Sequence, residues 1–210
     1  LDSDYSWGLF TTTLGWTDPL EFNRRNDEYY VQYKAGTLDI RDYIRFSTQA
    51  IRQQGAIKSG AAHAEFMSAV IQPALQEAAL DLVRIHQTQG DQVVIITATN
   101  EFVTRPIAEA FGVDNLIAVD LERDSSSGEA GWFTGEIKGV PSFREGKVTR
   151  IKAWLAARQL RLSEVESTFY TDSINDLSLM ENVTHPIATN PDDRLRAIAV
   201  DRGWRILDLF

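Results

Sequence analysis

Cysteine is absent from this 210-residue chain, which excludes disulfides, thiolate nucleophiles and cysteine-ligated zinc sites. Long apolar runs are also absent, because no stretch of the sequence approaches the length of a membrane span. No charged segment followed by an apolar segment opens the chain, so no secretion signal is recognised. We therefore expect a cytoplasmic protein without a membrane partner.

Basic residues are in the minority, with 21 Lys and Arg against 30 Asp and Glu and a net charge of −9. A general nucleic-acid surface is excluded, because no basic excess is present to neutralise phosphates. A small phosphorylated ligand is still compatible, since a metal ion and a local lysine can reverse the field of an acidic protein. The hydrophobic fraction of 43% predicts a globular chain with one sizeable core, or a core plus a smaller lobe.

Strand signals are lacking in the first part of the chain, where apolar residues recur at helical spacing. From residue 89 onward, short β-branched runs such as Val93–Ile96 alternate with helical patterns. This alternation is typical of βαβ units around a buried parallel sheet. The sequence therefore predicts a helical part over residues 1–88 and a doubly wound, Rossmann-like α/β core over residues 89–210.

Glycine, threonine and serine give several local predictions. Thr37 is expected to cap a helix. Gly55 and Gly60 are expected to bracket a loop, and glycines around Trp132 predict a small hairpin. The serines at 125–127 are expected to form a solvated loop.

Polar residues follow two of the predicted strands. Thr97 closes the first apolar strand, and Asp172 follows the short β-prone pair Phe169–Tyr170, with Asn175 and Asp176 shortly after it. Working groups of such sheets gather at the carboxyl ends of the strands, and one or two carboxylates there suit Mg²⁺. The alternative is an ordinary strand-to-helix loop in which Asp and Asn only cap the helix.

Nucleotide-binding glycine motifs are missing. The segment Gly139–Lys147 spaces its glycines too widely for a phosphate loop, and Val148 stands where Ser or Thr is required. No G-x-G-x-x-G motif occurs, which disfavours a nucleotide-binding Rossmann module. The three histidines are scattered without ligand spacing.

Four features stand in a fixed order: Thr97, the pair Gly146–Lys147 at a helix start, Asp172 and Asp176. This order, behind a helical segment, resembles the haloacid-dehalogenase superfamily of Mg²⁺-dependent phosphatases. The closer likeness is to its phosphoserine-phosphatase-like subfamily IB, whose helical cap is inserted after the first motif. The segments Ala98-Thr-Asn, Pro141-Ser-Phe-Arg-Glu-Gly-Lys and Asp2-Ser-Asp-Tyr are similar to that subset.

The resemblance implies an aspartyl-phosphate mechanism that uses Mg²⁺. Asp172 would hold the metal, and Asp176 would hold a metal-bound water or orient Lys147. Lys147 would act as a fixed cation beside the phosphate, and Thr97 would donate a hydrogen bond to a phosphoryl oxygen. The residues expected to contact the substrate are Asp2, Thr99, Asn100, Arg144 and Asn175.

The implied partner is a small phosphorylated metabolite that carries an amino group, such as phosphoserine or histidinol phosphate. The carboxylates of Asp2 and Asp4 favour a cationic group nearby. The protein is expected to be a monomer or a homodimer. A second hypothesis is a catalytically inactive, phosphate- or metabolite-binding regulatory protein.

The first motif of the family, D-x-D-x-[TV], is expected upstream of Leu1 together with its nucleophile. The segment Asp2-Ser-Asp-Tyr-Ser mimics the motif, but only Leu1 precedes it where an apolar strand is needed. The central first strand, between Val93–Ile96 and Phe169–Tyr170, is then missing, and two buried strand edges lose a partner. The chain is accordingly expected to be N-terminally shortened and unable to turn over.

Overall fold

The computed structural model describes residues 2–124 and 131–209; the serines predicted to form a loop at 125–127 lie outside these ranges. The described chain forms two compact units, each built from two stretches of sequence. The first unit comprises Leu1–Leu75 and Val93–Gly139, and the second comprises Gln76–Gln92 and Val140–Phe210, as far as these are described. Each unit takes residues from both sides of the boundary expected after residue 88, so a helical cap over an α/β core stays a prediction. In the described part of the chain, no helix is long and apolar enough to cross a membrane.

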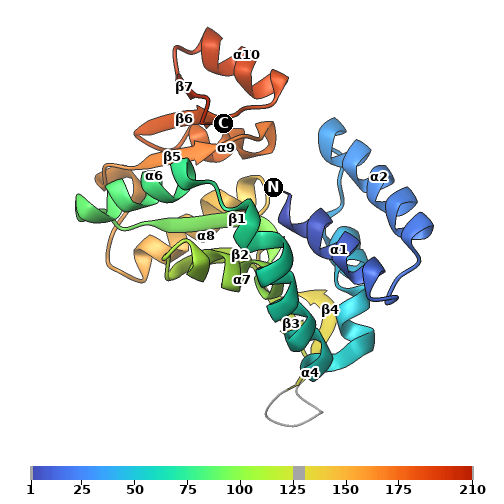
Figure 1. The fold of residues 1–210 in the computed structure, drawn as a ribbon. Helices are drawn as coiled ribbons and strands as arrows, with labels where there is room; N and C mark the ends of the chain where they lie inside the picture. The colour runs from blue at the N-terminus through green and yellow to red at the C-terminus, as the bar shows by residue number, and fades with distance from the viewer. Residues whose placement is uncertain (1, 125–130, 210) are drawn as a thin grey trace. The chain divides into compact units, whose positions relative to one another are not determined.

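Helices alone make up the described chain before residue 89, as the helical spacing predicted. In the first unit α1 and α2 lie side by side (Figure 1). The helices of this unit in the N-terminal stretch are α1 (Ser3–Thr13), α2 (Pro19–Ala35), α3 (Ile40–Ser47), α4 (Gln49–Phe66), the π-helix η1 (Met67–Ile71) and α5 (Gln72–Ala74).

Two local predictions in this stretch were wrong. The N-cap of α3 is Asp39, not Thr37, because the Asp39 carboxylate accepts hydrogen bonds from the backbone amides of Arg41 and Asp42. No loop separates Gly55 from Gly60, since α4 runs through both positions. Gly55 does interrupt the helix with a φ of 77°, which glycine adopts without strain, so a kink stands where a loop was expected.

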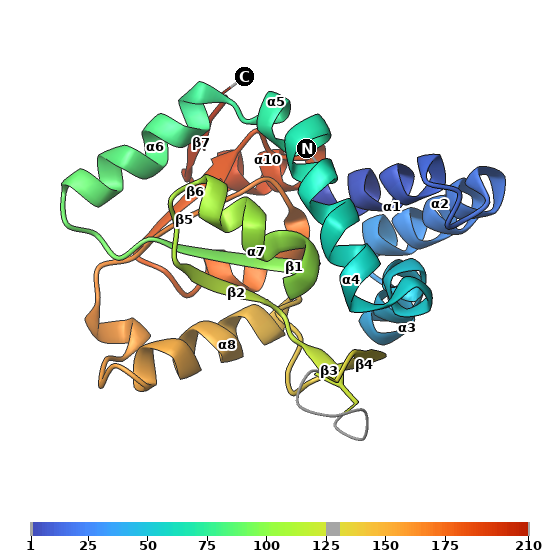
Figure 2. The ribbon, with the colours of Figure 1, turned by 60° about the horizontal axis from the view of Figure 1, so that its bottom comes forward.

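The strands of the first unit form two small sheets. The parallel pair is β1 (Val94–Asn100) with β2 (Asn115–Val119), and α7 (Glu101–Ala110) packs along it (Figure 2). The antiparallel pair is β3 (Leu121–Arg123) with β4 (Phe133–Ile137). The small hairpin predicted from the glycines around Trp132 is therefore confirmed, with β4 as one strand and β3 as its antiparallel partner.

Aromatic side chains dominate the core of the first unit. Trp7 is 1% exposed and makes edge-on contacts with the rings of Phe66 and Phe102. The buried aliphatic residues of β2, α3 and α4 complete this core. Burial of such large side chains is the main free-energy gain that fastens the N-terminal helices to the β1–β2 pair.

The second unit is a three-stranded parallel sheet with helices. Its strands, in the order β5-β6-β7, are β5 (Thr168–Thr171), β6 (His185–Thr189) and β7 (Arg205–Leu207). A small core of Met180, Ala188, Leu195 and Ala199 lies against this sheet. The helices are α6 (Glu77–Thr88), α8 (Glu145–Ala156), α9 (Leu177–Met180) and α10 (Asp193–Asp201), with 3-10 turns η3 (Leu162–Glu164) and η4 (Ile174–Asp176).

The alternation of helices with parallel strands confirms the predicted α/β fold class. Among the described strands, β1 pairs with β2 alone, and β5 pairs with β6 alone. A further strand beside either edge, as the resemblance implies, stays a prediction.

Candidate active site

A buried ion pair lies beside the carboxyl end of β5. The Lys147 Nζ atom is 2.6 Å from Asp176 Oδ1, and these side chains are only 7% and 10% exposed. Lys147 lies in the first turn of α8, and Asp176 occupies the N-cap position of α9. Two residues 29 positions apart in sequence are thus brought together by the packing of α8 against α9.

The second oxygen of Asp176 is also engaged. Thr171 Oγ1, on the last residue of β5, donates a hydrogen bond of 2.7 Å to Asp176 Oδ2. Both Thr171 and Asp176 are 8% exposed. A buried carboxylate is tolerated only when its oxygens find such donors, because desolvation of an unpaired charge is very unfavourable. Asp176 therefore fixes the position of the Lys147 amine.

A close backbone approach positions Lys147. A Cβ atom on Gly146 would lie 2.0 Å from the carbonyl oxygen of Pro141, so only glycine fits at this position. The chain can therefore fold tightly from Pro141 into α8, and Lys147 enters the helix where its side chain is buried. In the Gly-Lys pair singled out in the sequence, Gly146 is therefore required for steric reasons, and Lys147 supplies the positive charge.

Arg144 and Asn175 are also brought together. Arg144 Nε donates a hydrogen bond of 3.2 Å to Asn175 Oδ1, and the guanidinium lies over the Phe143 ring at 4.9 Å. Arg144 precedes α8 with φ 51° and ψ −124°, a backbone conformation that is strained for a non-glycine residue. Strain of this kind persists where the surroundings determine it, and it clusters at functional sites.

Asp172 directly follows β5 and remains exposed. Partial burial raises the pKa of the Asp172 carboxyl. The negative charge of Asp176 raises this pKa further, whereas the positive charge of Lys147 lowers it. The backbone carbonyl of Asp172 accepts a hydrogen bond from the amide of Asp192 at 2.8 Å. The backbone at Asp172 is thus fixed while its side chain remains exposed.

Two residues here were not predicted as site residues. Thr171 could have been noticed as a β-branched hydroxyl at the strand end, directly before Asp172. Asp192 follows the predicted strand Pro186–Ala188, and the strand-end rule selects the loop before it. One of its carboxylate oxygens accepts from the amide of Ile174 at 2.9 Å and the other from that of Leu195. It therefore ties the loop after β5 to the start of α10, a relation that only the fold creates.

The exposed carboxylate of Asp172 could serve as a protein ligand for one Mg²⁺ ion. Within the described residues, no group of three or more His, Cys, Asp or Glu side chains could hold a metal. Mg²⁺ commonly keeps several waters and binds through one or two carboxylates, so a single exposed carboxylate is compatible with it. Asp176 is a poorer direct ligand, because Lys147 and Thr171 already use its two oxygens.

The first unit holds the other predicted polar residues. The strand β1 does not end at Thr97 as expected but continues to Asn100, although its pairing with β2 is irregular between Ile96 and Asn100. Thr97 Oγ1 accepts a hydrogen bond from the amide of Thr99 at 3.2 Å. The predicted hydroxyl thus lies in the irregular part of β1, where the backbone departs from the regular ladder.

Asn100 is completely buried and caps α7. Its Oδ1 accepts from the amide of Val103 at 3.2 Å, and its Nδ2 donates to Asp4 Oδ1 at 3.4 Å. Asp4 is 7% exposed and also receives a hydrogen bond from the Tyr43 side chain. Burial, with a smaller contribution from the charge of Asp2, raises the pKa of Asp4 to about 7.

Asp2 is exposed, and it is the N-cap of α1, with Oδ1 accepting from the Tyr5 amide at 3.0 Å. Of the two acids expected to favour a cationic ligand, Asp4 is buried and occupied by Tyr43 and Asn100, so that expectation was wrong for Asp4. Asp2 alone is accessible.

The comparisons with known proteins agree with this arrangement. A family profile described as "haloacid dehalogenase-like hydrolase" matches residues 1–181. The chain belongs to the haloacid dehalogenase-like hydrolase family. It is 36% identical over 208 residues to a protein of Neisseria meningitidis serogroup C named "Histidinol-phosphatase", covering 99% of this chain and 92% of that protein.

Solved structures support the same fold for this hydrolase. A protein with unknown function from Bordetella pertussis is 47% identical, with a TM-score of 0.91, over 100% of this chain and 93% of that one. A probable phosphoserine phosphatase from Vibrio cholerae has a TM-score of 0.61 at 14% identity, over 98% of this chain and 56% of that one, and shows the fold alone. The predicted membership of the haloacid-dehalogenase superfamily and the predicted α/β fold class are confirmed. The phosphatase relatives support phosphomonoester hydrolysis as the class of reaction.

Proposed function

We propose that this chain carries most of the active site of a Mg²⁺-dependent phosphomonoester hydrolase that acts on a small phosphorylated metabolite. The observation that carries the proposal is the buried pair of Lys147 and Asp176 beside the exposed Asp172. Phosphoryl transfer needs fixed positive charge near the equatorial oxygens, and a cation held rigidly by a buried carboxylate supplies it without reorganisation.

Each residue has a defined task in this proposal. Lys147 binds a phosphoryl oxygen through its ammonium, and Asp176 with Thr171 keeps that ammonium in place. Asp172 supplies the carboxylate for Mg²⁺, which when bound polarises the phosphoryl group. Thr97 donates a hydrogen bond to a phosphoryl oxygen. The nucleophile is an aspartate of a D-x-D motif ahead of Leu1, which takes the phosphoryl group and releases the alcohol before water cleaves the aspartyl-phosphate.

The substrate class follows from the accessible acid and from the relatives. Asp2 is exposed and suits a substrate amine, while Arg144 and Asn175 form a polar pair beside the Lys147 turn. Thr99 would contact the substrate from the last part of β1, whereas the completely buried Asn100 would act only by fixing the end of that strand. We propose an amino-bearing phosphate ester, with histidinol phosphate ahead of phosphoserine, because the 36% identical relative carries the histidinol-phosphatase name. We further propose a helical cap over residues 1–88, a cytoplasmic location, and a monomeric or homodimeric protein.

The test is a panel of phosphomonoesters assayed with Mg²⁺ for the chain as it stands and for a version extended by its natural upstream residues. We expect hydrolysis of histidinol phosphate by the extended protein, and loss of at least about a hundredfold in kcat for its Lys147→Met variant. Arg161→Gln is the matched control, because Arg161 is an exposed cation that pairs only with Glu164 among the described residues.

The alternative of an inactive regulatory protein predicts a different result. It requires that the extended protein binds a phosphorylated metabolite in equilibrium dialysis without releasing phosphate. Equal activity of the two versions would instead refute the placement of the nucleophile ahead of Leu1.

A further inference from the structure

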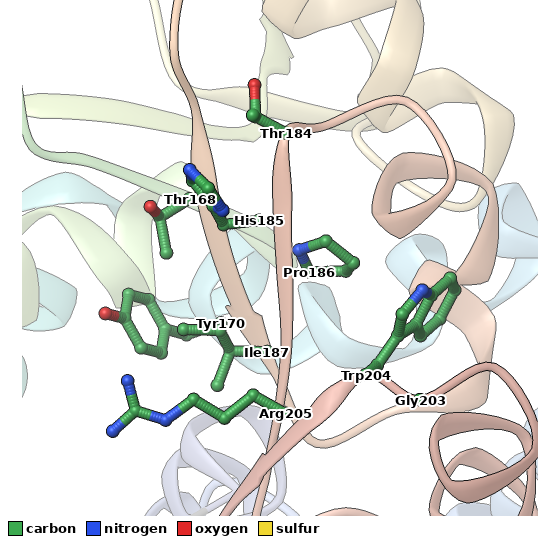
Figure 3. A pocket seen from close by; sticks show the side chains of 9 residues that line it. All are labelled: Thr168, Tyr170, Thr184, His185, Pro186, Ile187, Gly203, Trp204 and Arg205. Atoms are coloured by element: carbon green, nitrogen blue, oxygen red, sulfur yellow. The ribbon is translucent and has the colours of Figure 1, made fainter.

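A pocket lies in the second unit, at the amino-terminal end of its sheet. It has a volume of about 380 Å³ and is lined by the first residues of the three parallel strands, including Thr168, His185 and Arg205 (Figure 3). Asp172 and Asp176 follow β5 at its carboxyl end. The strands of a parallel sheet all begin at one edge and end at the other, so this pocket is separate from the candidate active site.

One face of the sheet contributes a row of three side chains to this pocket. Tyr170 pairs in register with Ile187, and Ile187 pairs with Arg205, so all three project to the same side. Figure 3 shows the guanidinium of Arg205 reaching back toward the phenol ring of Tyr170, on the same side of β6 as Ile187. The row therefore offers a cation and a hydroxyl on either side of an apolar floor.

Arg205 is exposed, and no hydrogen bond or ion pair of its side chain occurs among the residues that the structure describes. Its charge acts on Tyr170, where it opposes the increase that burial causes in the pKa of the phenol. The guanidinium presents planar, parallel N–H donors that match a carboxylate or phosphate group. An arginine that has no hydrogen-bonding partner in the described part of the chain, and lies beside a hydroxyl, is a suitable site for an oxyanion.

Tyr170 belongs to a hydrogen-bonded relay. His86 Nε2 is 2.8 Å from the Tyr170 hydroxyl, and His86 Nδ1 is 2.6 Å from Asp91 Oδ2. The Asp91 carboxylate only accepts, so Nδ1 carries a hydrogen. In the neutral ring Nε2 accepts from the Tyr170 hydroxyl, whereas in the doubly protonated ring Nε2 donates to the phenol oxygen and leaves the phenolic hydrogen for a ligand. In both states the relay holds the Tyr170 oxygen in place at the pocket.

The remaining walls include apolar side chains and a hydrogen-bonded histidine. Pro186 and Trp204 lie on the other side of β6 in Figure 3 and extend the pocket with apolar surface. His185 Nε2 lies 2.9 Å from Glu166 Oε1, so these two side chains already have a partner in each other. The pocket combines the Arg205 guanidinium with aromatic and aliphatic surface.

We infer that this pocket is a second ligand site, which binds a small oxyanion carrying an apolar or aromatic body, with Arg205 and Tyr170 as its polar contacts. The ligand is a carboxylate or a phosphate of this kind. The inference does not depend on the proposed phosphatase activity, because it concerns binding at the opposite edge of the sheet.

The test is a binding titration of the whole chain by ¹H–¹⁵N NMR with three probes: benzoate, phenylphosphonate and the uncharged benzyl alcohol. We expect dissociation constants on the order of 1 mM for at least one anion, and much weaker binding of benzyl alcohol. The indole signal of Trp204 should shift. Benzoate and phenylphosphonate distinguish a carboxylate site from a phosphate site.

Variants assign the binding to the pocket. Arg205→Gln should weaken anion binding about tenfold, and Tyr170→Phe by a smaller factor, since charge-assisted hydrogen bonds are the stronger ones. Arg161→Gln is the control for a lost surface charge, and Lys147→Met combined with Asp176→Asn is the control for anion binding at the candidate active site. Equal binding of benzyl alcohol, unchanged affinity in Arg205→Gln, or loss of binding in the folded Lys147→Met, Asp176→Asn variant would each overturn the inference.

Discussion

Lys147 and Asp176 form a buried ion pair, with the Lys147 amine 2.6 Å from one carboxylate oxygen of Asp176. Lys147 enters from the first turn of α8, and Asp176 stands at the start of α9. The pair links the two segments that were singled out in the sequence for their charge. The pair also contributes to the stability of the second unit, because both charges are buried away from water and each would be costly to leave uncompensated.

Removal of one member of this pair should be more harmful than removal of both. Lys147→Met should lower the free energy of unfolding by about 3 kcal/mol, because Asp176 is left as a buried charge. The double variant Lys147→Met with Asp176→Asn should recover part of this loss, since the uncompensated carboxylate is gone. Urea denaturation of the two single variants and the double variant measures the coupling. Strictly additive losses would show that the pair is not coupled.

The hydroxyl of Thr171 should matter more than its position on a short strand suggests. Thr171→Val keeps the shape of the side chain but leaves Asp176 Oδ2 without its donor, which should cost about 1–3 kcal/mol. Thr168→Val is the matched control on the same strand, since Thr168 is exposed and its change should stay within about 0.5 kcal/mol. Thermal unfolding of both variants tests this. Similar losses for the two would argue against the hydrogen bond to Asp176.

Glycine at position 146 should be irreplaceable. In Gly146→Ala the new Cβ would meet the Pro141 carbonyl oxygen at 2.0 Å, so the backbone must move and stability should fall by roughly 1–3 kcal/mol. Gly60→Ala is the control, because a Cβ there meets nothing within 4 Å and alanine favours the α4 helix by about 0.5–1 kcal/mol. Opposite signs of the two changes in chemical denaturation are expected. A neutral Gly146→Ala would mean that the turn before Lys147 is loose.

Asp4 should make the stability of the protein depend on pH near neutrality. Its pKa is raised by burial to about 7, so the folded protein binds this proton more tightly than the unfolded chain does. Stability from this group is therefore fully present below the unfolded value of about 4 and is lost as pH rises toward 7, by up to about 4 kcal/mol. In Asp4→Asn this loss should vanish.

The measurement is the free energy of unfolding of wild type and Asp4→Asn between about pH 4 and pH 8. The stability of the variant relative to wild type should rise with pH. Asp2→Asn is a useful companion, because the charge of Asp2 contributes to the raised pKa of Asp4, and its removal should move the transition to lower pH. A constant difference between wild type and Asp4→Asn would show that Asp4 titrates normally.

Replacement of Asp172 should impair catalysis while leaving the stability of the fold nearly unchanged. Because the side chain is exposed, Asp172→Asn should change the free energy of unfolding by less than about 1 kcal/mol. In the extended protein, the same change should raise the Mg²⁺ concentration needed for half-maximal activity at least about tenfold, since one carboxylate ligand is lost. Activity against Mg²⁺ concentration, with a chelator as blank, checks this. An unchanged Mg²⁺ dependence would remove Asp172 from the metal site.

Local sequence determined the class of fold and several single positions. The β-branched run Val93–Ile96 and the change from helical to alternating patterns near residue 89 follow from short-range preferences of the backbone. So does the end of α7 just before Gly112, which has a φ of 68°. The order of Thr97, Lys147, Asp172 and Asp176 also marked the correct family, because this chemistry requires these residue types at strand ends and helix starts.

Only the tertiary structure decided which groups are partners. The donation from Thr171 to Asp176, the support of the β5 loop by Asp192, and the burial of Asp4 against Asn100 join residues whose separation in sequence gives no sign of contact. The sequence likewise gives no sign that Tyr170 and Arg205 lie on one face of the sheet. They do so because β5 and β7 each pair in parallel with β6, in a register that aligns both residues with Ile187. Sequence periodicity reports the direction of each side chain relative to its own element, whereas contacts between elements depend on packing and register, which the whole chain settles together.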